Sequence, residues 1–145
     1  MLEKMRDIIK GNDLCVLATV SVGSPHCSLM SYISDEEGQE VYLVSHKETK
    51  KYSNLLENPT VSLLIDAREE EKRQRRIDIK ALTVSGKFQI INDVGKKDLI
   101  RARFLKSHSH LTDFVNDPGA EIFSIKIKSF QLLEGVKNAF FESVE

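Results

Sequence analysis

Two adjacent lysines, Lys50 and Lys51, follow Thr49 where a short helix is predicted to begin. A helix N-terminus presents unpaired N–H groups and a partial positive charge, so it is a natural place for an anion. Cations in that first turn are unfavourable for the helix itself, by roughly 0.3–1 kcal/mol each at low salt. A dianion such as a phosphate between the lysines would offset this cost. The spacing therefore raises the hypothesis of a phosphate site, with a solvated helix tip as the alternative.

The four histidines are the other side chains that could act as ligands or as acid–base groups. His26 and His46 lie at the ends of predicted strands, where each could face a ligand or simply be exposed. His108 and His110 are two residues apart, and this spacing does not place both rings on one helix face. We therefore expect a solvated helix end at this pair, with a metal or haem site as the alternative.

The sequence motifs of several enzyme classes are missing from the chain. It contains no GxSxG, HExxH, Walker or GxGxxG pattern, which argues against the hydrolase, metalloprotease and nucleotide-binding classes that use them. Cys15 and Cys27 fall in apparent strands without CxxC or metal spacing. We expect both to be reduced, partly buried thiols.

Composition and charge favour one domain spanning residues 1–145. A chain of this length can bury a core without metal or disulfide support. Its net charge of −1 exerts no overall pull on nucleic acid or anionic lipid. No apolar run approaches the roughly 20 residues that span a bilayer, and the N-terminus lacks the apolar centre of a signal peptide. We expect a cytoplasmic protein that binds neither nucleic acid nor membranes.

Hydrophobic periodicity predicts six strands, of which the first three form an antiparallel meander. The strands span residues 14–22, 26–34, 41–45, 60–66, 77–91 and 123–132. Helices are predicted over residues 2–10, from Thr49 to before Pro59, from Asp93 to about 106, and around 111–117. The second of these helices would place Tyr52, Leu55 and Leu56 on the sheet. The charged residues 67–76 fit a solvated hairpin tip better than a nucleic-acid patch, because three glutamates offset the neighbouring basic residues.

Two irregularities in the long strands favour a barrel over a βαβ fold. Gly86 interrupts one face of its strand, which indicates a bend or a close backbone approach. In the final strand the apolar phase shifts by one residue between Ile127 and Phe130, so we expect a β-bulge near Ser129. With few helices, this pattern predicts a mainly β protein with helices (α+β), built on a closed antiparallel barrel.

The middle of the chain resembles the FMN-binding split-barrel family of pyridoxamine 5′-phosphate oxidase-like proteins. In that family a strand is followed by a small hydroxyl residue, then Ser/Thr-Arg/Lys-Lys, a short helix and Asn-Pro-x-Val-Ser-Leu. The corresponding residues here are Ser45, Thr49-Lys50-Lys51 and Asn58-Pro59-Thr60-Val61-Ser62-Leu63. The resemblance extends over roughly residues 5–135.

The resemblance implies a six-stranded antiparallel split β-barrel, and a homodimer with FMN in the cleft between protomers. It implies that Lys50 and Lys51 hold the FMN phosphate, with Thr49 and Ser45 as hydroxyl donors. The flavin ring would lie along the second strand, flanked by the third. The matching ring-contacting residues are Cys27, Ser28, Leu29, Met30 and Val44.

The chain departs from the true oxidase of this family at its substrate-binding residues. The oxidase carries Arg and His in a C-terminal substrate-binding stretch and typically ends in Arg-Leu-x-Pro, but here no arginine follows Arg103 and no histidine follows His110. A lysine that ends the second-strand motif in the oxidase is also replaced, by Met30-Ser31-Tyr32. We therefore expect an FMN-dependent oxidoreductase acting on another small molecule, with its catalytic residues unassigned. The alternatives are an FMN carrier or electron-transfer module, an F420-binding module, and a haem-handling protein.

Overall fold

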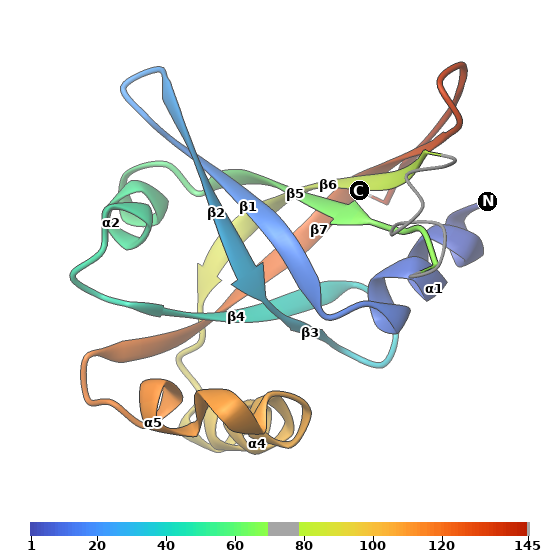
Figure 1. Cartoon of the computed structure of the whole chain (residues 1–145). Coiled ribbons are helices and arrows are strands. Elements are labelled where there is room, and N and C mark those ends of the chain that lie inside the picture. The colour runs from blue at the N-terminus through green and yellow to red at the C-terminus, as the bar shows by residue number, and fades with distance from the viewer. Residues whose placement is uncertain (70–78, 145) are drawn as a thin grey trace.

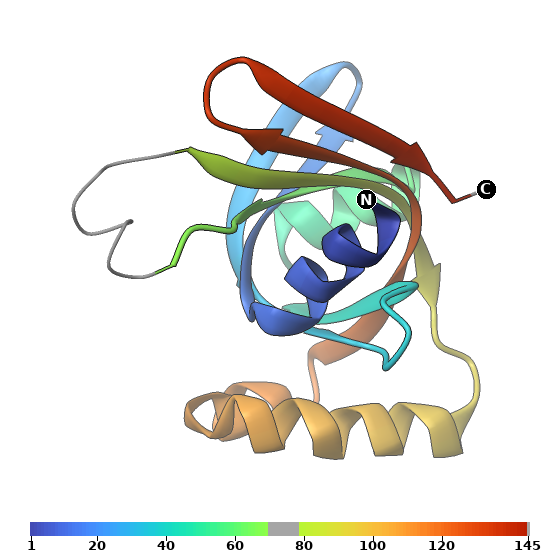
Figure 2. The same cartoon turned by 90° about the vertical axis from the view of Figure 1, so that its right-hand side faces the viewer.

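The computed structural model describes residues 1–69 and 79–144. They form a mainly antiparallel sheet that curls into a half-barrel, with helices packed around it (Figure 1). Figure 2 shows α1 across one end of the curled sheet, with α4 below it. Most of the charged segment 67–76 lies outside the described residues, so its predicted hairpin tip stays a prediction. No helix in the described part is long and apolar enough to cross a membrane.

The elements follow the labels of Figure 1. The helices are α1 (Leu2–Gly11), α2 (Lys50–Glu57), α4 (Val94–Ser107), the short 3₁₀ helix η1 (Ser109–Leu111) and α5 (Thr112–Val115). The strands are β1 (Leu14–Ser21), β2 (Ser24–Ser31), β3 (Ile33–Ser34), β4 (Glu40–His46), β5 (Thr60–Asp66), β6 (Lys80–Ile90), β7 (Ala120–Glu134) and β8 (Asn138–Ser143).

The sheet has the strand order β2-β1-β5-β6-β7-β4-β3, with β8 paired to β7. The mainly β class is therefore confirmed, but the described residues form eight strands where six were predicted. The second predicted strand breaks at Tyr32, whose hydroxyl donates to the Ile9 carbonyl of α1 at 2.8 Å. Within the described residues no backbone pairing joins β2 to β4, so the barrel is split, as the family resemblance implies, and not closed, as the strand pattern alone predicted. The predicted meander holds in part, because Ile33 and Ser34 at the end of the predicted second strand pair with β4. The sheet is split between these two strands.

Two apolar cores hold the helices on the sheet. The main core fills the curl of the sheet and receives α1, through Met5 and Ile9, and α2, through Tyr52 and Leu55. The second core lies between the outer side of β4 and β7 and the helices α4 and α5. One helix face was predicted incorrectly, because Leu56 is 55% exposed. Its expected place against the sheet is taken by Asn54, which is buried and donates to Thr19 Oγ1 at 3.2 Å.

The predicted irregularities of the long strands are confirmed in the pairing of β6 with β7. Ser85 pairs with Ser129, but Gly86 pairs with Ile127, so Lys128 is the extra residue of a bulge. A Cβ at Gly86 would lie 2.6 Å from the Lys126 carbonyl oxygen. The backbone of β7 therefore approaches β6 closely beside the bulge, which lets the sheet curl.

Gly86→Ala is expected to lower the free energy of unfolding by about 1–3 kcal/mol, because the added methyl group forces apart two packed strands. Gly11→Ala is the matched control, since nothing lies within 4 Å of a Cβ at the end of α1. Urea unfolding of both variants measures the difference. Equal stability of the two would contradict the close approach at Gly86.

Candidate functional site

The start of α2 is fixed by hydroxyl groups from two residues. Thr49 is the N-cap, and its Oγ1 accepts a hydrogen bond from the Tyr52 N–H at 3.3 Å. The same hydroxyl donates to the His46 carbonyl at 2.9 Å. Ser45 is the last residue but one of β4 and is fully buried, with its Oγ 3.0 Å from Thr49 Oγ1. The structure therefore brings Ser45 and Thr49 together directly before the two lysines.

Lys50 and Lys51 are the first two residues of α2. Lys50 is exposed and Lys51 is half-buried. In the described part of the chain, neither ammonium group pairs with a carboxylate, and neither backbone N–H meets an acceptor. The next two N–H groups, of Tyr52 and Ser53, both bond to Thr49. The helix start thus offers two unpaired N–H groups beside two unpaired ammonium groups, which is the donor set that a phosphate dianion requires.

The β2 residues predicted to contact a flavin ring alternate between the two faces of the strand. Cys27 and Leu29 are exposed, Leu29 at 70%, whereas Met30 is buried and Ser28 is half-buried. The expectation that Cys27 is partly buried was wrong, because it lies on the outer face of a strand paired only with β1. Cys15 is buried, and its burial raises the pKa of the thiol to about 12. A thiol that stays protonated at neutral pH is a poor nucleophile.

Val44 is placed differently from the other predicted ring contacts. Its side chain is 4% exposed and packs in the second core, under α4 and α5. The structure does not bring this side chain to the open surface beside β2. Figure 1 shows instead that β2, the end of β4 and α2 lie around the same split side of the sheet.

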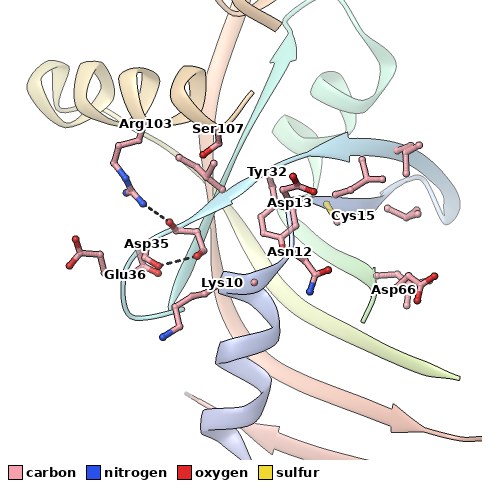
Figure 3. A pocket seen from close by; sticks show the side chains of 17 residues that line it. Lys10, Asn12, Asp13, Cys15, Tyr32, Asp35, Glu36, Asp66, Arg103 and Ser107 are labelled. Atoms are coloured by element: carbon pink, nitrogen blue, oxygen red, sulfur yellow. Dashed lines mark hydrogen bonds between the residues drawn. The ribbon is translucent and has the colours of Figure 1, made fainter. Parts of the chain in front are cut away.

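A cavity of about 860 Å³ lies at another end of the fold, between α1, the start of β1, β3 and α4 (Figure 3). Leu29 is the one predicted contact residue among its lining side chains, and the lysines of α2 are not part of it. Its polar groups bond largely to the protein itself. Arg103 donates to the Ser34 carbonyl at 2.8 Å, and Asp35 accepts from two backbone N–H groups. Burial raises the pKa of Tyr32, so this phenol stays neutral at ordinary pH.

His46 is half-buried, and both of its ring nitrogens have neighbours within the protein. Its Nε2 lies 3.4 Å from Asp117 Oδ1, and its Nδ1 accepts from the Glu48 N–H at 3.3 Å. Gly119 packs against the ring so closely that a Cβ there would lie 2.3 Å from Nε2. The sequence identified Pro118-Gly119 only as the end of a helix, so the role of Asp117 was missed. No local pattern connects it to a histidine 71 positions earlier in the chain.

The prediction of a solvated helix end at residues 108–110 was wrong for His108. This ring is 3% exposed, lies 4.7 Å from the Phe104 ring, and has its Nε2 2.9 Å from the Tyr32 carbonyl oxygen. His110 is exposed, as expected. The described residues contain no group of three side chains that could hold a metal ion.

Comparisons with known proteins identify the family of this fold. A family model described as pyridoxamine 5′-phosphate oxidase matches residues 1–134. General stress protein 26 of Bacillus subtilis (strain 168) is 28% identical over 131 residues, which cover 90% of this chain and 86% of that protein.

Solved structures show the same fold at lower identity. A FAD-binding protein from Mesorhizobium loti matches with a TM-score of 0.76 and 20% identity, over 93% of this chain and 95% of that one. A haem-binding protein from Mycobacterium smegmatis matches with a TM-score of 0.82 and 18% identity, over 97% of this chain and 57% of that one. Because the family model matches nearly the whole sequence, the chain belongs to the pyridoxamine 5′-phosphate oxidase-like split-barrel family.

Proposed function

We propose that this protein binds FMN at the start of α2 and acts as a flavin-dependent oxidoreductase on a small molecule. The observation that carries the proposal is the donor set of Lys50 and Lys51. Two ammonium groups and two backbone N–H groups without partners among the described residues stand at a helix N-terminus. A phosphate dianion at this point would satisfy all four and remove the repulsion between the lysines and the helix dipole.

The Thr49 hydroxyl next to the lysines fits the same ligand. Thr49 is half-buried, so its hydroxyl can turn from the His46 carbonyl toward a phosphate oxygen. Ser45 Oγ is fully buried, lies 3.0 Å from Thr49 Oγ1 and bonds to the same carbonyl, so it supports Thr49. The exposed side chains of Cys27 and Leu29 offer an apolar surface for a planar ring on β2. Bound FMN would supply hydride or electron transfer at its isoalloxazine ring. The residues of the chain would then bind the phosphate and orient the ring.

We also propose a homodimer with the cofactor between protomers. Leu29, Val16 and Leu64 lie in one row across β2, β1 and β5. Leu29 is 70% and Leu64 is 46% exposed, so the row leaves apolar surface uncovered on the outer side of the sheet. A second copy over this row would bury it and cover the ring-binding side of β2. Pyridoxamine phosphate is not the proposed substrate, because Met30 and Ser31 stand where the family's oxidase ends its strand motif with a lysine.

An absorption spectrum of the purified protein, recorded before and after FMN is added, tests the proposal. We expect the bands of bound flavin to stay with the protein through gel filtration, at the elution volume of a dimer. A protein that ignores FMN but takes up F420 or haem would overturn the cofactor assignment. If the protein binds none of the three cofactors, the two lysines are only a solvated helix tip.

A further inference from the structure

We propose that His46, held by Asp117, is a positioning residue that fixes the turn from His46 to Thr49 and so shapes the phosphate site at the start of α2. The inference rests on the proposed FMN site. It adds a residue that contacts neither the lysines nor the hydroxyl pair through its ring.

The contacts of the ring favour one tautomer of the neutral imidazole. Nδ1 accepts from the Glu48 N–H at 3.3 Å, so this nitrogen carries no proton. The proton of the neutral ring is therefore on Nε2, which faces Asp117 Oδ1 at 3.4 Å. A carboxylate on one nitrogen stabilises the tautomer that leaves the other nitrogen free to accept.

Asp117 is itself fixed in a closed set of contacts between two segments of the chain. Its Oδ1 accepts from the Gly119 N–H at 2.7 Å. The Gly119 carbonyl in turn accepts from the Lys47 N–H at 2.9 Å, so the segment before β7 is joined to the turn before α2. Gly119 has no room for a side chain against the ring. The ring of His46 is thus clamped between the turn on one side and the segment 117–119 on the other.

The clamp connects directly to the helix cap. The His46 carbonyl accepts from both the N–H of Thr49, at 3.2 Å, and its Oγ1, at 2.9 Å. If the ring is removed, the Glu48 N–H loses its acceptor and the turn can adopt more conformations. Ordering that turn again on binding costs affinity, because a preorganised site avoids this entropic cost.

Three substitutions of His46 separate the effect of its hydrogen bonds from the effect of its size. Asn can accept from the N–H two residues later, as Nδ1 does, but does not reach Asp117. Gln can reach toward Asp117 but has no acceptor in the place of Nδ1, and Ala has neither. We expect FMN dissociation constants about five- to tenfold higher for His46→Ala and His46→Gln, as for one lost hydrogen bond, and a smaller increase for His46→Asn, which keeps the acceptor for the Glu48 N–H but loses the contact with Asp117. His110→Ala, at an exposed ring outside the site, is the matched control.

Hydrogen exchange of the Glu48 amide in the FMN-free protein tests the order of the turn independently of FMN binding. The amide should exchange faster in His46→Ala than in the wild type, and His46→Asn should restore its protection. Unchanged exchange and unchanged FMN affinity in His46→Ala would overturn the inference. A loss of affinity in His46→Asn as large as in His46→Ala would assign a structural role to the ring instead. A wild-type protein that binds no FMN would refute the proposed function, while restored protection in His46→Asn would still support the assignment of the turn.

Discussion

Replacing Lys50 and Lys51 together by Ala is expected to weaken FMN binding by several kcal/mol. Charge-assisted hydrogen bonds contribute about 1.5–3 kcal/mol each, and no other described side chain in the first turn of α2 carries a positive charge. The helix itself should keep its stability or gain slightly, because two cations leave the positive end of its dipole. Titration of the protein with FMN, followed by quenching of flavin fluorescence, measures the loss.

The matched control is Lys106→Ala with Lys137→Ala. Both lysines are exposed, and the double variant changes the net charge equally without touching α2. This control should bind FMN as the wild type does, apart from a small general effect of charge that salt removes. Riboflavin, which lacks the phosphate, should bind the double variant and the wild type about equally. Unchanged FMN affinity after loss of Lys50 and Lys51 would refute the phosphate site.

The regular elements were predictable because burial in them follows strand and helix periods. In β7 the residues Phe123, Ile125 and Ile127 are buried on one phase, and Phe130 and Leu132 on the next. The sequence records this shift directly, so the bulge was predictable from one chain. The cap at Asp93 was predictable for the same local reason, since its carboxylate accepts from the Lys96 N–H.

What could not be predicted depends on contacts between distant segments. β8 was missed because Phe140 and Phe141 are adjacent, so the strand shows no alternation, and both remain partly exposed. His108 was assigned to solvent because its polarity fits a helix end. Its acceptor, the Tyr32 carbonyl, comes from a strand break that the pattern did not show. Burial of a polar ring is decided by whether a partner exists, and that partner lies 76 residues away.

The candidate site divides in the same way. Thr49, Lys50 and Lys51 are contiguous, so the helix start and its charges were predictable from spacing alone. The clamp on His46 requires Asp117 and Gly119 to arrive beside β4 at the start of β7, which only the register of the sheet decides. Local chemistry is visible in a sequence, whereas the residues that hold it in place are set by topology.

Phe123→Ala is expected to lower the free energy of unfolding by about 3–5 kcal/mol, the usual cost of removing a fully buried phenylalanine ring. Phe123 is 0% exposed and lies at the centre of an aromatic group in the main core. Its ring centroid is 5.3 Å from that of Phe88 and 6.5 Å from that of Tyr52. Tyr52 follows Lys51 in α2. The space left by the missing ring should therefore also make the first turn of α2 more mobile and weaken FMN binding there.

Urea unfolding of Phe123→Ala and of Phe141→Ala makes the comparison, because Phe141 is 66% exposed in the edge strand β8. The control should change stability by no more than about 0.5 kcal/mol. Phe123→Leu, which refills part of the space, should recover a portion of the loss and restore FMN binding along with it. If Phe123→Ala and Phe141→Ala cost the same, the aromatic group does not hold α2 on the sheet. If stability falls but FMN affinity does not, the start of α2 keeps its shape without Tyr52, and the cap at Thr49 and the clamp at His46 suffice to hold it.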